Sequence, residues 1–204
     1  MGLYGDRVLP LVIDRVCASR IFTRWRERAC AELAGAVVEI GFGSGTNVPF
    51  YPDEVDVVYA VEPSSRALEL AAARLARSAT RVVVAGGDAQ SIGLADDSCD
   101  AALATFVLCT VPDPARALAE VRRVVRPGGT LHFLEHGAAE RAGVLALQHL
   151  LDPLEVRLAG GCHLTRRPLE LVRAAGFEVE WHEEGQARGP APWSQFTVGV
   201  ARVP

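Results

Sequence analysis

A glycine-rich turn with three carboxylates near it is the part of this sequence that points most directly to chemistry. The apolar run 36–40 leads into Gly41-Phe42-Gly43-Ser44-Gly45. Glycine has no side chain, so this turn can be tight and can approach a ligand closely. Glu39 lies inside the run, Glu62 ends the next apolar run, and Asp88 ends the one after that. Because ligands of open parallel sheets bind beyond the carboxyl ends of the strands, we expect the turn and the carboxylates to share one ligand.

The spacing favours a ligand with an adenosine part and an amino-acid part over a dinucleotide. Thr46 stands where the dinucleotide fingerprint G-x-G-x-x-G has its third glycine. Glu62 follows Gly41 by 21 residues, the distance at which a carboxylate takes both hydroxyls of an adenosine ribose. A buried Glu39 needs donors, which an ammonium group and neighbouring backbone N–H groups supply. Asp88 is placed to accept from an adenine amino group. Each carboxylate alone is also explained as a strand-end cap, whereas the set together with the turn is not.

Alternating strand and helix patterns place these residues in an α/β fold. Five apolar runs alternate with helical segments, which predicts a parallel sheet with right-handed crossovers. The last two strands are too close in sequence for a helical crossover, so one edge strand should be antiparallel. We therefore predict a Rossmann-like, doubly wound, mostly parallel seven-stranded sheet. The expected strands are 36–40, 56–63, 81–88, 99–108, 130–137, 177–184 and 194–203, and the expected helices are 64–78, 114–126, 141–158 and 168–175.

Length and composition indicate one domain, with residues 1–33 as a helical cap and 34–204 as the core. The cap should contain one or two amphipathic helices with a break near Ala18-Ser19. A net charge of −4 gives no reason to expect nucleic-acid binding. Six arginines within residues 1–28 fit a solvated helix face, and they also fit a patch for acidic substrates or membrane surfaces. No integral membrane segment and no secretory signal is expected, so we predict a cytoplasmic location.

The five cysteines indicate reduced thiols rather than a metal site or a disulfide framework. Their number is odd and none forms a C-x-x-C pair. They also form no Cys/His cluster with zinc spacing, so no metal is expected.

Four segments together resemble the successive motifs of class I S-adenosylmethionine-dependent methyltransferases. These segments are EIGFGSG, AVEPS, GDAQSIGLADDSCDAAL and VVRPGGTLHFLEH, and the resemblance covers about residues 36–136. It implies S-adenosyl-L-methionine as cofactor and S-adenosyl-L-homocysteine as product. It also implies that the glycines cradle the methionine part, Glu62 holds the ribose, Asp88 with Ala89 faces the adenine, and the backbone of Thr105 contacts the amino group. The implied cofactor residues are Glu39, Gly41, Phe42, Gly43, Gly45, Asn47, Glu62, Pro63, Ser64, Asp88, Ala89 and Thr105.

A narrower resemblance concerns the methyl acceptor. FVLCTV, EHG, QHLLDP and GCHLTR are similar to motifs of the methyltransferase-like thiol S-methyltransferases. A thiol has a pKa near 8.5, so roughly 10% is already thiolate near pH 7.5 and little activation is needed. This argument favours thiol or amine acceptors over alcohols and does not choose between them. N-, O- or C-methylation of another small molecule, including a lipid or quinone-like one, stays open.

Three residues are the candidates for catalysis on the acceptor side. His136 ends the fifth expected strand and should face the cleft as a base or an orienting group, although a structural hydrogen bond explains it equally well. Cys109 is expected as a small apolar contact beside the substrate rather than as a nucleophile. Asp152 and His163 lie in the tail motifs and are placed to reach the pocket, and Tyr4 of the cap is placed to close over it.

Two functions outside this class share the fold. An NAD-dependent oxidoreductase would need the missing third glycine and a hydride-transfer site. A non-catalytic S-adenosylmethionine-binding module would bind the cofactor without transferring its methyl group. We expect an enzyme with a small-molecule substrate that acts as a monomer or homodimer.

Overall fold

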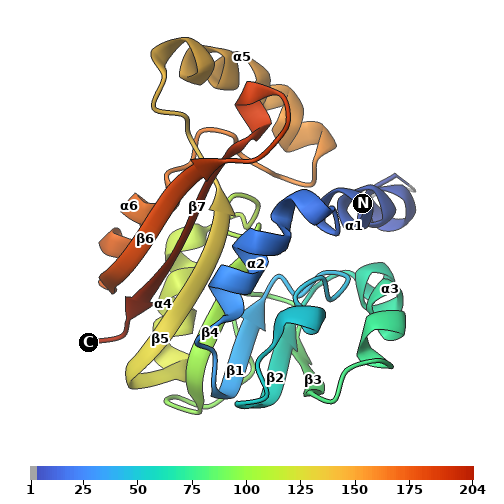
Figure 1. Ribbon diagram of the computed structural model, residues 1–204, viewed down its shortest axis with the longest axis vertical. Helices are drawn as coiled ribbons and strands as arrows, with labels where there is room; N and C mark the ends of the chain where they lie inside the picture. Colours follow the sequence, from blue (N-terminus) through green and yellow to red (C-terminus); the bar gives the residue numbers. More distant parts are fainter. Residues whose placement is uncertain (1–3) are drawn as a thin grey trace.

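Seven strands form one sheet in the order β3-β2-β1-β4-β5-β7-β6 in a computed structural model that describes residues 4–204 (Figure 1). The strands β1 to β5 run parallel to one another, and β7 pairs antiparallel with both β5 and β6. The predicted fold class is confirmed, and the antiparallel strand lies one position inside the edge. The strands are β1 (Gly35–Ile40), β2 (Val55–Val61), β3 (Arg81–Gly86), β4 (Cys99–Thr105), β5 (Val125–His136), β6 (Glu178–Gln186) and β7 (Gln195–Arg202).

Helices cover both faces of this sheet, which explains why the central strands are apolar at consecutive positions. Val38 packs with α4 and α6 on one face, whereas Val37 packs with α2 on the other. The helix α3 packs on the same face as α2, through Ala71 against Ala60 of β2. The helices are α1 (Leu9–Cys17), α2 (Thr23–Cys30), α3 (Ser65–Leu75), α4 (Pro114–Val124), α5 (Ala142–Leu158) and α6 (Pro168–Ala174), with the shorter turns η1 (Tyr4–Val8), η2 (Arg20–Phe22), η3 (Val48–Phe50) and η4 (Ala191–Trp193).

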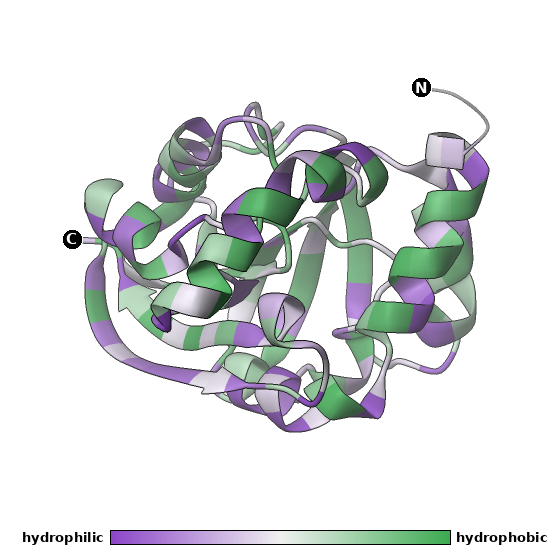
Figure 2. Cartoon of the chain, turned by 90° about the horizontal axis from the view of Figure 1, so that it is seen from above, coloured by the Kyte–Doolittle hydropathy of each residue, from purple (hydrophilic) through white to green (hydrophobic). Residues whose placement is uncertain are grey.

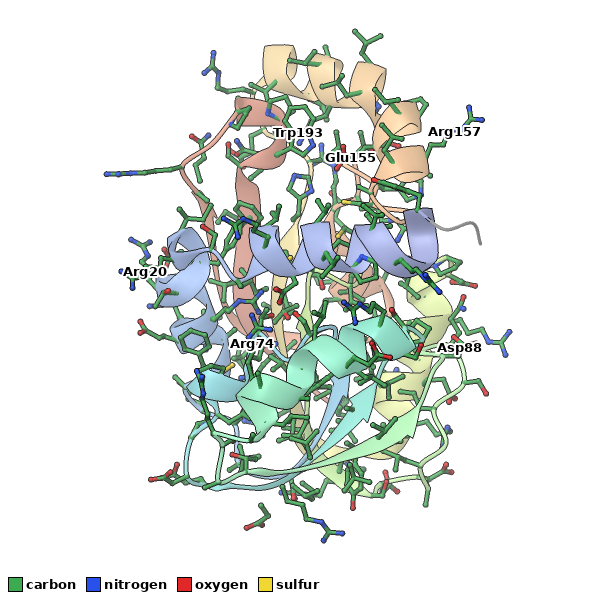
Figure 3. The ribbon with its side chains drawn as sticks, turned by 90° about the vertical axis from the view of Figure 1, so that its right-hand side faces the viewer. Arg20, Arg74, Asp88, Glu155, Arg157 and Trp193 are labelled. Atoms are coloured by element: carbon green, nitrogen blue, oxygen red, sulfur yellow. The ribbon has the colours of Figure 1, made fainter. Side chains whose placement is uncertain are left out.

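The N-terminal helices α1 and α2 divide where the sequence predicts a break. α1 ends at Cys17, and the Ser19 side chain accepts from Ile21 N at 3.5 Å as the chain turns. α1 then lies between α3 and α5, beyond the carboxyl ends of the central strands (Figures 1 and 3). The Tyr4 hydroxyl donates to the Leu158 carbonyl at 2.8 Å, which ties this segment to the end of α5. The cap therefore covers the edge of the sheet where a ligand site is expected.

Apolar side chains remain on the outer surface of α1 and α5, where green and purple segments alternate (Figure 2). Val16 of α1 and Leu150 of α5 are 56% and 75% exposed. No helix within residues 4–204 combines the length and the apolar character needed to cross a membrane.

The strand β5 begins earlier than the sequence predicts. The pattern Pro127-Gly128-Gly129 suggested a break before a strand at 130, yet β5 starts at Val125, directly after α4. The amide of Gly128 donates to Val203 O at 2.9 Å, and Val203 N donates to Gly129 O at 2.8 Å. These partners come from the far end of the chain, so local sequence patterns could not reveal them.

Gly185 of β6 makes room for the cap, and its replacement is a test of this packing. A Cβ at Gly185 would lie 2.4 Å from Cη2 of Trp25, whose ring is 5% exposed. We expect Gly185→Ala to lower the free energy of unfolding in urea by about 1–3 kcal/mol, because a well-packed core must shift to accept it. Gly143→Ala in α5 is the control, since a Cβ there meets nothing within 4 Å. Equal stabilities of the two variants would contradict the placement of α2 on β6.

Candidate active site

The glycine turn after β1 has a backbone that other residues adopt only with strain. Gly41, Gly43 and Gly45 have φ angles of 68°, 57° and 71°, in the left-handed region that favours glycine. A Cβ at Gly41 would lie 2.7 Å from Cβ of Val107, whereas one at Gly43 would be 3.8 Å from its nearest neighbour, Gly41 O. The first glycine therefore permits close packing against the loop after β4, and the second leaves open space beside the turn.

Glu62 joins the end of β2 to this turn. Its Oε2 accepts from Gly43 N at 2.8 Å, and its Oε1 accepts from Ser64 N at 2.9 Å. Burial raises the pKa of Glu62, and the two backbone N–H groups oppose that rise. Ser64 in turn caps α3, because its hydroxyl accepts from Ala67 N at 3.2 Å. Each carboxylate oxygen has a second lone pair, so Glu62 can accept further hydrogen bonds.

Asp88 follows β3 and lies beside the end of β2. Glu62 N donates to Gly86 O at 3.0 Å, and a Cβ on Gly87 would be 3.4 Å from Pro63 Cα, so the two strand ends are adjacent. Asp88 is exposed, and its Oδ1 accepts from Gln90 N at 2.8 Å. The hydrogen bonds from Gln90 lower the pKa of Asp88. The neighbouring Ala89 is buried. The structure thus brings Glu62 and Asp88 to one edge of the sheet, as the sequence predicts.

Glu39 is fully buried in β1 and receives its hydrogen bonds from side chains. Asn47 Nδ2 donates to Oε1 at 2.9 Å, and the Tyr51 hydroxyl donates to Oε2. Burial raises the pKa of Glu39 to about 7, against the lowering by these two bonds. The expectation of backbone N–H donors for this carboxylate is therefore wrong, because side chains donate to it. No sequence pattern pointed to Tyr51.

Arg26 of α2 is a member of this network that the sequence analysis did not identify. Its Nη1 donates to Asn47 Oδ1 and to Thr105 Oγ1, and its Nη2 donates to Cys17 O at 3.1 Å. Arg26 is 2% exposed, and burial lowers its pKa. Its Nε has no hydrogen-bond partner within residues 4–204. A signal for it existed, since Arg26 lies four residues from the buried Phe22 and Cys30, on the apolar face of the helix.

Arg74 of α3 attaches the cap to the glycine turn. One nitrogen, Nη1, donates to Asp14 Oδ1 at 2.7 Å and to Ser44 O at 2.8 Å. Figure 3 labels Arg74 on α3, which lies below α1 in that view. The charged hydrogen bonds of Arg74 therefore hold α1 next to the turn.

The loop after β4 forms the boundary with the acceptor side. Thr105 ends the strand, and its hydroxyl accepts from Asn47 Nδ2 at 2.9 Å. Phe106 then takes a φ of 57°, a strained value for this residue type. The amides of Val107, Leu108 and Cys109 donate to the carboxylate of Glu135 at 2.9 to 3.3 Å. This ends β4 before the predicted residue 108. Glu135 is fully buried, and burial raises its pKa to about 7.

His136 ends β5 and is 6% exposed. Its Nε2 lies 3.2 Å from the Pro192 carbonyl oxygen. Because a carbonyl can only accept, this bond assigns the proton to Nε2 and leaves a lone pair on Nδ1. In the part of the chain that the structure describes, Nδ1 has no hydrogen-bond partner. A ring with this tautomer can accept a proton at Nδ1.

Asp152 is hydrogen-bonded to the turn after α5. Its Oδ2 lies 3.1 Å from Nδ1 of His163, and its Oδ1 accepts from Leu164 N at 2.6 Å and from Thr165 Oγ1 at 3.3 Å. Asp152 therefore organises the loop 163–165.

A cavity of about 350 Å³ lies away from the glycine turn. It is lined by the β5–α5 loop, α6 and the β6–β7 strands, and it touches none of the predicted cofactor residues.

Among residues 4–204, no three His, Cys, Asp or Glu side chains are grouped as a metal ion would require.

Sequence comparisons find known proteins that are similar to this chain. The family described as a methyltransferase domain matches residues 38–133. Thiol S-methyltransferase TMT1B from Homo sapiens is 36% identical over 170 residues, which cover 80% of this chain and 67% of the relative. The corresponding protein from Rattus norvegicus is 35% identical, with 80% and 66% covered. The chain thus spans about two thirds of the length of these relatives.

Solved structures show the same fold. A SAM-dependent methyltransferase from Thermotoga maritima has a TM-score of 0.70 at 22% identity, with 98% of each chain covered. Phosphoethanolamine N-methyltransferase 2 from Haemonchus contortus, in complex with S-adenosylhomocysteine, has a TM-score of 0.70 at 15% identity, with 96% of this chain and 60% of that chain covered.

Glu39 should make stability depend on pH in a defined direction. Its carboxyl has a pKa near 7 in the folded chain and near 4.5 otherwise, so the folded state binds the proton more tightly. Its stabilising contribution is present below about pH 4.5 and is lost as pH rises through 7. We expect Glu39→Gln to remove about 2–3 kcal/mol from the decrease in unfolding free energy between pH 4.5 and 7.5.

Urea unfolding at both pH values measures this difference. Glu135 also has a raised pKa and still contributes to the loss of unfolding free energy in the variant, so this loss is reduced rather than abolished. Glu54→Gln, at an exposed carboxylate before β2, is the matched control and should follow the wild type. An unchanged pH dependence in Glu39→Gln would show that Glu39 is not the buried acid described here.

Proposed function

Because the chain belongs to the family of S-adenosylmethionine-dependent methyltransferases, we propose that it methylates the sulfur of a small-molecule thiol. Family membership rests on relatives 35% and 36% identical to it across 80% of its length. The choice of a thiol as acceptor is supported by those relatives, which are thiol S-methyltransferases, and by one feature of the site. That feature is His136, whose lone pair on Nδ1 is unpartnered in residues 4–204 at the carboxyl end of β5.

The residues around the glycine turn fit the cofactor. Glu62 retains lone pairs for the two ribose hydroxyls, and Asp88 retains an oxygen for the adenine amino group. The open space beside Gly43 leaves room for the methionine part. The free Nε–H of buried Arg26 is a donor suited to a carboxylate. When bound, S-adenosylmethionine supplies an electrophilic methyl group on a sulfonium, and S-adenosylhomocysteine is the product.

The other predicted cofactor residues lie in the glycine turn and at the neighbouring strand ends, where they support this arrangement. Phe42 is buried beneath the turn, and Pro63 and Ala89 belong to the adjacent ends of β2 and β3. Asn47 and Thr105 hold the turn to the end of β4, and their side chains bond to each other. Glu39 is fully buried, so its role is to position Asn47, whereas the partly exposed Glu62 can reach a ligand.

His136 completes the acceptor side by taking the proton of the thiol. The S–H bond breaks as Nδ1 gains the proton, the ring becomes cationic, and the sulfur keeps the electron pair. Nε2 meanwhile stays bonded to the Pro192 carbonyl, which fixes the ring. Thiols are only about 1–2 kcal/mol from ionisation near neutral pH, so one histidine is a sufficient base. Cys109 is 3% exposed and serves as a small wall of this region.

Charge and thiol state fit an enzyme of small molecules in the cytoplasm. The net charge is −4, and the five cysteines are all free in the structure. Such thiols persist in reducing compartments. An acceptor screen by mass spectrometry, with thiols, amines, phenols and quinols, tests the proposal through the gain of one methyl group. Methylation of amines or phenols with thiols inert would overturn the thiol assignment.

Glu62→Gln tests the cofactor site by calorimetry with S-adenosylhomocysteine. Hydrogen bonds to a charged group contribute about 1.5–3 kcal/mol, so we expect the Kd to rise about 10- to 150-fold. Glu69→Gln, on the exposed side of α3, should bind as the wild type does. Urea unfolding of both variants checks that the bonds to Gly43 and Ser64 are not the cause. An unchanged Kd in Glu62→Gln would place the ribose elsewhere.

His136→Gln tests the base while keeping a donor for the Pro192 carbonyl. With a thiol of pKa near 8.5 we expect kcat at pH 7.5 to fall about 10-fold, because roughly 10% of the thiol is already ionised. With an aromatic thiol of pKa below 7 the loss should vanish. His149→Gln, exposed on α5, is the control. An equal loss with both thiols would show that His136 orients the acceptor rather than deprotonating it.

A further inference from the structure

Two turns that carry cysteines are bound tightly to each other on the acceptor side. The turn 161–166 follows α5, whose last turns carry Glu155 and Arg157 (Figure 3). The turn 106–111 follows β4. His163 N donates to Cys109 O at 2.8 Å. The guanidinium of Arg166 donates to Leu108 O and Val111 O, both at 2.7 Å. These three bonds hold the two turns in one fixed arrangement.

Cys109 and Cys162 lie on neighbouring backbone segments at this contact. The amide that donates to Cys109 O directly follows Cys162, so the backbones of the two cysteines are adjacent. A disulfide needs Cα atoms about 4.4–6.8 Å apart, which neighbouring backbones provide. Gly161 permits the approach, since a Cβ there would lie 3.0 Å from Thr110 O. Cys109 is buried, and Cys162 is partly exposed and can be reached by a small reagent.

The surroundings favour a thiolate on Cys162 and a thiol on Cys109. A hydrogen bond from the Cys109 thiol lowers the pKa of Cys162, against the effect of burial. The same thiol pair raises the pKa of Cys109 well above its ordinary value. The other cysteines differ, because burial raises the pKa of Cys17 to about 11 and also raises that of Cys99. One nucleophilic sulfur therefore lies next to one protonated partner.

We propose that Cys109 and Cys162 are a site of reversible oxidation by hydroperoxides, which joins them in a disulfide. The inference does not depend on the identity of the methyl acceptor. Because Cys109 N donates to Glu135, the residue before His136, the disulfide forms beside the region where we place the acceptor, and its formation should block methyl transfer.

The reaction balances with hydrogen peroxide as the oxidant. The Cys162 thiolate attacks one peroxide oxygen, an S–O bond forms, the O–O bond breaks, and the departing hydroxide takes a proton to become water. Cys109 then attacks the sulfur of the sulfenic acid, the S–S bond forms, and a second water leaves with the Cys109 proton. The sulfurs together lose two electrons, and the peroxide gains them. Two equivalents of a small thiol reverse the bond by exchange.

Peptide mapping of the full chain tests this directly. Trypsin gives peptide 158–166 with Cys162, but it leaves Cys99 and Cys109 together in peptide 82–116. The Cys99→Ser variant therefore makes the assignment unambiguous, and it also serves as the matched control. This variant is treated with hydrogen peroxide at pH 7, and free thiols are then blocked with iodoacetamide.

We expect peptides 82–116 and 158–166 to appear joined, with the loss of two hydrogens, and to separate after dithiothreitol. Cys162→Ser, at a partly exposed position, should not form the link while keeping the wild-type unfolding curve. Loss of methyl transfer on oxidation should be reversed by dithiothreitol. Full alkylation of Cys109 and Cys162 after peroxide, pairing of Cys162 with Cys17, or conversion of Cys162 to a sulfinic acid would each overturn the proposal.

Discussion

A buried carboxylate at the end of β1 is the constraint on which the rest of the site depends. Glu39 has no exposure to solvent, so leaving its oxygens without donors would destabilise the fold strongly. Asn47 and Tyr51 supply the donors, and Asn47 also binds Thr105 and Arg26. One acidic group thus fixes the glycine turn, the end of β4 and the cap helix α2 relative to one another.

A second buried carboxylate has the same role two strands along the sheet, on β5. Glu135 near the end of β5 is also fully buried, and it accepts hydrogen bonds from three successive amides of the loop after β4. Glu39 orders the glycine turn and Glu135 orders the loop after β4. The groups with spare hydrogen-bonding capacity, Glu62, Arg26 and His136, lie around these two fixed points, which is the preorganisation that catalysis by positioning requires.

The sequence predicted most of what depends on local pattern. The strands, the glycine turn and the placement of Glu62 and Asp88 at strand ends follow from apolar runs, turn residues and spacing. What it missed depends on contacts between distant segments. Arg26 was grouped with solvated arginines because its partners lie 21 and 79 positions away. The start of β5 needs the backbone of Val203, and the occupation of Asp152 by a loop becomes visible only once that loop is folded.

The structure of the chain bound to S-adenosylhomocysteine tests the central claim most directly. That claim is that the network of Glu39, Asn47, Thr105 and Arg26 holds the glycine turn in place beside the cofactor. The account predicts the ribose hydroxyls on Glu62, with both oxygens of Glu39 still bonded to Asn47 and Tyr51. A ligand in the cavity between α6 and the β6–β7 strands, or a Glu39 that releases Asn47 to bind the ligand itself, would contradict it.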